Sequence, residues 1–154
     1  MYKKILLPTD GSTYANSEVD RATKLLADDG EVIVLSVAGK ITSSAFQSRT
    51  RVRNINKRLL KEAENNVKVM VEKFPDDINV KGMVEVGFPA EKIVEVAERE
   101  NIDLVIISSS GKSGLHKFII GSVAEKVLKT IEIDTMLIHS DWFREGIIWK
   151  TIRS

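Results

Sequence analysis

The chain has 154 residues, enough to bury the core of one domain. Hydrophobic residues make up 43% and charged residues 29%, a balance typical of a soluble globular protein rather than a disordered one. The formal net charge of +1 excludes a global field that favours nucleic acid or an anionic membrane, and the lack of cysteine excludes disulfides and thiolate chemistry. No signal peptide is recognisable, and no apolar run reaches the ~20 residues of a membrane helix. We therefore expect a cytoplasmic protein.

The first third of the chain predicts a strand, a helix and a second strand. Residues 5–7 form an apolar strand that residues 8–12 end. Asp28, Asp29 and Gly30 are expected to end the helix, with Gly30 as its C-terminal cap. Residues 31–37 are β-branched and nearly all apolar, which is typical of a strand buried on both faces of a parallel sheet. The helix is predicted by apolar or small residues that recur every three or four positions: Ala15, Val19, Ala22 and Leu26.

The middle of the chain predicts a long loop over residues 38–49, then the longest helix. Residues 78–86 alternate in polarity and predict an edge strand, and Pro89 suits the first turn of a third helix. The apolar stripe of the long helix is Val52, Ile55, Leu59, Ala63, Val67, Met70 and Phe74. A basic run predicts a solvated face, with a lid over a bound phosphate tail as the alternative: Arg49, Arg51, Arg53, Lys57, Arg58 and Lys61.

The last third predicts a strand over residues 103–107, a helix and a fifth strand over Thr135–His139. Ser122 and Glu125 have the spacing of a capping box at the start of that helix. The fifth strand is expected at the edge of the sheet, where it needs cover. The alternation of strands and helices predicts an α/β fold: an open five-stranded parallel sheet of order 3-2-1-4-5 with helices on both faces.

In such sheets ligands bind beyond the carboxyl ends of the strands, where the strand order reverses. Residues 8–12 and 108–122 would then converge on one crevice. Small residues between a buried strand and a helix N-terminus expose backbone N–H groups that can hold a phosphate. Residues 108–122 do not form a Walker A loop. Ile106 stands where that pattern needs glycine, and the helix is expected from residue 122 instead of directly after Lys112-Ser113. The dinucleotide pattern G-x-G-x-x-G is also absent.

Gly111 is followed by nine residues and then by Gly121-Ser122. This spacing resembles the ATP-binding signature of the universal stress protein family, G-x2-G-x9-G-[ST]. Residues 4–12 look like the opening strand of that family, and the resemblance covers residues 1 to about 140. One position departs from the signature: its first glycine is Ser108 here, whose hydroxyl could hydrogen-bond a ribose or crowd it.

The resemblance implies one Rossmann-like domain over residues 1–140, related to the adenine nucleotide alpha hydrolase fold. Residues 141–154 extend past that fold and contain both tryptophans, so we expect this tail to pack on the domain or on a dimer partner, ahead of the alternative of an interfacial membrane helix. The implied ligand is ATP or AMP, with Mg²⁺ as a companion ion. Taken alone, Asp10 would predict only a turn with Gly11, and Ser122 only a helix cap. The implied nucleotide-binding residues are Pro8, Thr9, Asp10, Val37, Ala38, Ser108, Gly111, Gly121, Ser122 and Val123.

The function that the resemblance implies is a nucleotide-binding regulatory protein of the stress response that acts through nucleotide-dependent association. It would form a homodimer through Thr135–His139 and the tail, without nucleic acid or membrane. The alternative is an interaction module of the same fold that binds no nucleotide, which Ser108 favours. No nucleophile–base pair is visible, so we expect no dedicated enzyme, with slow ATP hydrolysis left open. Adenylyl transfer would need a motif such as S-G-G-x-D, which residues 110–113 do not match, and His116 and His139 are too few for a metal site.

Overall fold

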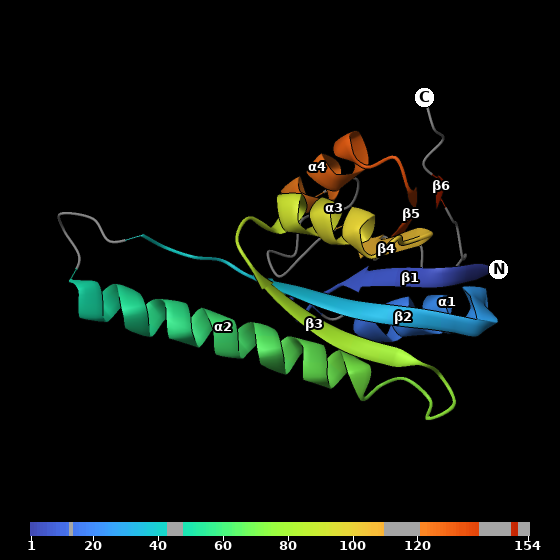
Figure 1. The fold of residues 1–154 in the computed structure, drawn as a ribbon, viewed down its shortest axis with the longest axis horizontal. Helices are drawn as coiled ribbons and strands as arrows, with labels where there is room; N and C mark the ends of the chain where they lie inside the picture. The colour runs from blue at the N-terminus through green and yellow to red at the C-terminus, as the bar shows by residue number, and fades with distance from the viewer. Residues whose placement is uncertain (13, 43–47, 110–120, 139–148, 151–154) are drawn as a thin grey trace.

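The computed structural model describes residues 1–12, 14–42, 48–109, 121–138 and 149–150. Strands and helices alternate along the described chain up to the last two strands (Figure 1). Their bounds are β1 (Tyr2–Pro8), α1 (Ala15–Leu25), β2 (Leu26–Ala38), α2 (Arg49–Val71), β3 (Val80–Val86), α3 (Pro89–Arg99), β4 (Leu104–Ser108), α4 (Ser122–Thr130), β5 (Asp134–Ile138) and β6 (Trp149–Lys150).

The strands form one sheet of order β3-β2-β1-β4-β5-β6, in which β1 to β5 are parallel. The predicted order 3-2-1-4-5 is therefore confirmed. The sheet also gains a strand, because β6 pairs antiparallel with β5 through Met136↔Lys150 and Leu137↔Trp149. The prediction that the fifth strand is an edge strand is wrong for this reason: the tail supplies a segment that pairs with it. The edge prediction for β3 is confirmed.

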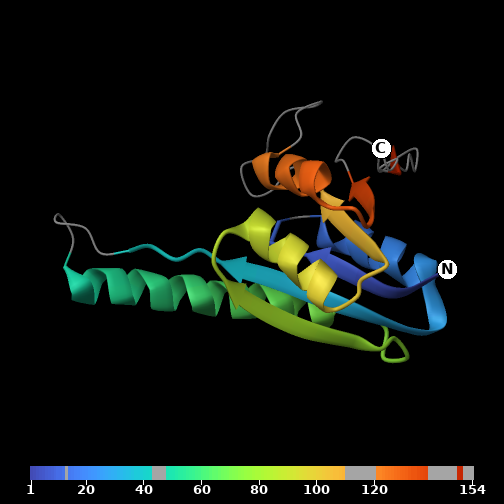
Figure 2. The same cartoon turned by 45° about the horizontal axis from the view of Figure 1, so that its top comes forward.

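Successive side chains of each strand point to opposite faces, and a pair of helices covers each face (Figure 2). On β1, Ile5 and Leu7 pack towards α1 and α2, whereas Leu6 packs towards α3 and α4. All three side chains are fully buried. Burial on both faces explains why the inner strands are nearly continuous apolar runs. The two cores fix the carboxyl ends of β1 and β4 side by side.

The end of α1 differs from the prediction. The helix ends at Leu25, and Leu26 is already extended and pairs with Tyr2 of β1. The strand pairing then shifts, because the next pair is Lys4↔Glu31. Gly30 is therefore not the helix cap: it lies inside this irregular part of β2, where a Cβ would lie 2.6 Å from Leu26 Cδ1. A strand pairing distant in the sequence decides where the helix ends.

The N-terminal half of α2 runs past the end of the sheet (Figures 1 and 2). The preceding segment is tied to it by Asn56, whose side chain exchanges two hydrogen bonds of 2.9 Å with the backbone of Ile41. All six residues of the predicted basic run are exposed, which agrees with a solvated face. Figures 1 and 2 place this end of α2 away from α3 and α4, an arrangement that gives the lid alternative no support.

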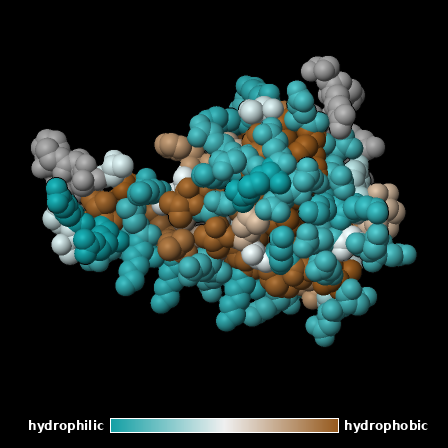
Figure 3. All heavy atoms as spheres, viewed as in Figure 1, coloured by the Kyte–Doolittle hydropathy of each residue, from teal (hydrophilic) through white to brown (hydrophobic). Residues whose placement is uncertain are grey.

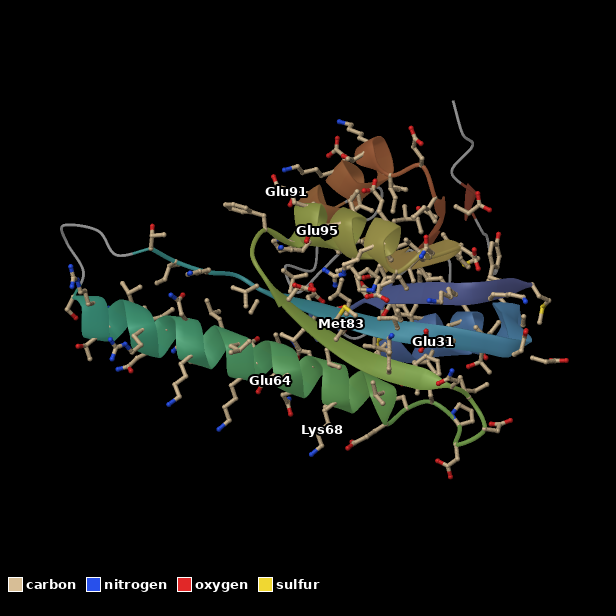
Figure 4. All side chains as sticks on the ribbon, viewed as in Figure 1. Glu31, Glu64, Lys68, Met83, Glu91 and Glu95 are labelled. Carbon is tan, nitrogen blue, oxygen red and sulfur yellow. The ribbon has the colours of Figure 1, made fainter. Side chains whose placement is uncertain are left out.

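The outer surface of α2 is hydrophilic, and hydrophobic residues gather along β3 beside it (Figure 3). Glu64 and Lys68 illustrate the polar face of the helix, since both point away from the sheet (Figure 4). Among the helices of the described residues, none combines the length and the apolar character that a membrane crossing requires.

Candidate functional site

A cavity of about 340 Å³ lies at the carboxyl ends of β1, β2 and β4, beside the first turns of α3 and α4. This is the place where the strand order reverses, as the sequence predicts. Its walls are mostly apolar, with a few polar groups from β1, β4 and α4. The residues that line it are Pro8, Thr9, Asp10, Leu35, Val37, Pro89, Ile93, Ile107, Ser108, Ser109, Gly121, Ser122, Val123 and Ala124.

The turn after β1 brings the carboxylate of Asp10 to the cavity. The N–H of Thr9 donates to the Leu35 carbonyl at 2.8 Å and so extends the pairing of β1 with β2. The chain then turns at Gly11, whose φ of +81° suits glycine, and the Ser12 N–H donates to Asp10 Oδ1 at 3.0 Å. Asp10 therefore has both roles: its carboxylate accepts the hydrogen bond that closes the turn, and the residue also lines the cavity.

The first turn of α4 forms another part of the wall. Gly121 is the N-cap residue, and among the described residues no side chain caps this helix by a hydrogen bond. The predicted capping box is therefore wrong: Ser122 is already helical, and Glu125 Oε1 instead accepts from Lys129 Nζ at 2.7 Å. Ser122 and Val123 are exposed towards the cavity. The first N–H groups of a helix lack partners within it and carry partial positive charge, so an anion is stabilised there.

The end of β4 also lines the cavity. Ser108 is half-buried, and Ser109 is 1% exposed. The Ser109 N–H donates to the Ile138 carbonyl at 2.8 Å, and its own carbonyl accepts from Gly121 N–H. These bonds hold the N-terminus of α4 against the ends of β4 and β5. Within the described part of the chain, the Ser109 hydroxyl has no hydrogen-bond partner.

A buried carboxyl group lies behind the cavity wall. Glu18 on α1 is 2% exposed. The pKa of its carboxyl is raised to about 8, by burial first and by the Asp10 carboxylate second, against hydrogen bonds from the hydroxyl and N–H of Ser108 that lower it. Among the described residues no group hydrogen-bonds to Glu18 Oε1. At neutral pH this side chain is therefore a neutral carboxylic acid.

Eight of the ten predicted nucleotide-binding residues line the cavity. Ala38 does not line it, and its carbonyl accepts from the Gly87 N–H at 3.0 Å. Gly111 lies outside the described residues, as do His116 and His139. Sequence reasoning missed the apolar wall from α3, Pro89 and Ile93, although that helix also follows the carboxyl end of a strand.

Glu18 is a further residue that the sequence patterns did not predict. This position falls three residues after Ala15 and four before Ala22, inside the apolar stripe of α1. A charged residue within a buried stripe is the signal that could have identified it.

The chain matches the model of the universal stress protein family over residues 1–139. A universal stress protein of Methanothermobacter thermautotrophicus is 36% identical over 134 residues, covering 83% of this chain and 89% of that protein. Universal stress protein MJ0531 of Methanocaldococcus jannaschii is 34% identical over 142 residues, covering 90% and 82%. The solved structure of MJ0577, also from Methanocaldococcus jannaschii, has a TM-score of 0.73 and 32% identity, covering 90% of this chain and 96% of that one. The chain belongs to the universal stress protein family.

Proposed function

We propose that this protein binds an adenine nucleotide, ATP or AMP, in the cavity and acts as a regulatory protein through nucleotide-dependent association. The observation that carries the proposal is the N-terminus of α4, which opens on the same cavity as Asp10 without a side-chain cap. The first N–H groups of a helix lack partners within it, and they suit a phosphate together with the positive end of the helix dipole.

The remaining walls suit the nucleoside. Leu35, Val37, Ile93 and Ile107 give an apolar slot that can hold the flat face of an adenine. The Asp10 carboxylate can accept hydrogen bonds from the ribose hydroxyls or the adenine amino group. A volume of about 340 Å³ lies within the range of small-molecule sites, which is about 300–1,000 Å³.

Relatives of the same fold provide a precedent. One universal stress protein, 22% identical with a TM-score of 0.55, was solved in complex with cAMP. A family member from Arabidopsis thaliana, 20% identical with a TM-score of 0.57, was solved with AMP bound. At these identities the likeness shows the fold alone, so the support for nucleotide binding comes from the cavity of this chain.

Mg²⁺ enters the proposal only with the phosphates of ATP. Within the described part of the chain, no group of three or more acidic or histidine side chains could hold a metal ion. The ion would therefore be held chiefly by the nucleotide, as is common for Mg²⁺.

Isothermal titration with ATP and AMP tests the proposal, using the variant Gly121→Val and the matched control Gly39→Val. A valine at Gly121 places a side chain where the backbone must approach phosphate, so binding should be abolished. Among the described residues other than its two chain neighbours, none has an atom within 4 Å of a Cβ added at Gly39, so the control variant should bind like the parent. The absence of heat and of a thermal shift at millimolar ATP and AMP would reject nucleotide binding.

The second candidate is an interaction module of the same fold that binds no nucleotide. Ser108 favours it, because a serine occupies the place of the first signature glycine. In both candidates we propose that the outer edge of β5 and β6 takes part in a homodimer. Light scattering after gel filtration, with and without AMP, separates them: a dimer that responds to AMP supports the regulatory protein, and a constant dimer that does not bind AMP supports the module.

A further inference from the structure

We propose that the binding of an anionic nucleotide in this cavity takes up a proton on Glu18, so that affinity falls as the solution becomes more alkaline. This inference rests on the proposed function, because it concerns the ligand of the same cavity. Glu18 does not line the cavity itself. It lies behind two residues that do, Asp10 and Ser108, and it interacts with both.

One charged residue, Asp10, and one neutral residue, Ser108, interact with the Glu18 carboxyl. α1 packs against β1, β2 and β4. The turn after β1 contributes the Asp10 carboxylate, and β4 contributes the uncharged Ser108. Among the described residues, Asp10 is the only charged side chain whose field acts on the Glu18 carboxyl, and neither β2 nor the rest of α1 adds another. No cation therefore offsets an ionised Glu18 within the part of the chain described.

The free protein already favours the protonated form at neutral pH. Glu18 is almost fully buried, and its pKa is raised to about 8 by burial first and by Asp10 second. Among the described residues, its Oε1 atom has no hydrogen-bond donor that could stabilise a negative charge. Above pH 8 the site therefore carries a second negative charge behind its wall, beside that of Asp10.

A bound nucleotide would strengthen the preference for the protonated form. A phosphate at the first turn of α4 adds negative charge to the cavity, and the nucleoside displaces water from Asp10 and Ser108. Both changes disfavour the ionised form of Glu18, because like charges repel more strongly in a drier environment. Linkage is reciprocal, so a ligand that favours the proton is itself favoured by the proton.

Ser108 connects this carboxyl group to the family signature. Its hydroxyl hydrogen-bonds to Glu18, so it is directed towards α1 rather than into the space of a ligand. A serine at this place can then be accommodated without blocking the cavity. The same bond lowers the pKa of Glu18 and brings its ionisation nearer to neutral pH. Ser108 thus acts on the nucleotide through Glu18, as a positioning residue.

Titration of AMP by calorimetry at pH 7.5 and pH 9.0 tests the inference, because AMP keeps the same charge over this interval. With a pKa of about 8, the protonated fraction of Glu18 falls about eightfold, and the affinity should fall by up to the same factor. At pH 8.5 the measured heat of AMP binding should depend on the ionisation enthalpy of the buffer, because the buffer supplies the proton that the complex takes up. In Glu18→Gln the affinity should be independent of pH, whereas the exposed-site control Glu98→Gln should keep the full dependence.

Ser108→Gly provides a second variant whose effect a merely structural role would not produce. It removes a hydrogen bond that lowers the pKa of Glu18, so the midpoint of the affinity loss should move to higher pH. AMP binding that is equally strong at both pH values, or an equal loss in Glu18→Gln, would overturn the inference and leave the proposed function standing. Absence of AMP binding at both pH values would overturn the proposed function itself.

Discussion

Replacement of Glu18 by glutamine should stabilise the folded protein, and the gain should grow with pH. The folded protein holds the Glu18 proton up to a pKa of about 8, whereas the unfolded chain loses it at the ordinary value of 4.5. Between these values the folded state binds more protons than the unfolded state, so the stability contributed by this group falls as pH rises. The contribution is fully present below pH 4.5 and has been lost above pH 8.

The size of the effect follows from the two pKa values. Between pH 4.5 and pH 8, each pH unit lowers the unfolding free energy of the parent by about 1.4 kcal/mol. The loss is about 3 kcal/mol at pH 7 and about 5 kcal/mol above pH 8. Glutamine carries no charge, and its amide oxygen can still accept the hydrogen bonds of Ser108. The penalty should therefore disappear in Glu18→Gln.

The assay is urea unfolding followed by circular dichroism at pH 5, 6, 7, 8 and 9. The difference in unfolding free energy between Glu18→Gln and the parent should rise by about 1.4 kcal/mol per pH unit from pH 5 and level off above pH 8. Glu98→Gln, which removes an exposed carboxylate, should differ from the parent by less than about 0.5 kcal/mol throughout. A difference that does not change with pH would refute a buried, proton-holding Glu18.

Three further changes test other parts of the molecule. Ser108→Gly should leave the affinity for AMP at pH 7 unchanged or higher, and a large loss in calorimetry would show that the hydroxyl contacts the ligand. Gly11→Ala should lower the unfolding free energy by about 1–2 kcal/mol in urea, because φ is +81°, whereas Gly39→Ala, with open space around it, should not. Removal of residues 141–154 takes β6 from the proposed dimer edge, so light scattering should show a shift from dimer towards monomer; an unchanged mass would contradict that role for β6.

The parts of the fold that sequence reasoning predicted are those that local patterns determine. The nearly continuous apolar, β-branched residues 31–37 predict a buried strand, and the regular apolar stripe of α2 predicts that helix. The convergence of Asp10 and Gly121 on one cavity follows from the strand order, which right-handed crossovers and the alternation of elements restrict strongly. The spacing of glycine and serine then indicated which loops form the site.

The parts that were missed depend on contacts between distant residues. α1 ends at Leu25 because Leu26 pairs with Tyr2, and no local cap signals this. β6 has two residues, and it is a strand because these residues pair with β5. The Ser122–Glu125 spacing fits a capping box, but Gly121 occupies the cap position and Glu125 finds Lys129 instead. In each case a contact in the folded chain overrides a valid local preference.

Glu18 and Ser108 are best understood together. From the sequence, Ser108 is a defect in a signature and Glu18 a polar residue of an ordinary helix. The structure brings the hydroxyl of one to the carboxyl of the other, behind a cavity wall that also contains Asp10. A buried acid costs stability, so this position would be better served by an apolar residue if folding were its only role. The cost is understandable if the proton of Glu18 belongs to the ligand-binding equilibrium, which makes the departure at position 108 part of the site rather than damage to it.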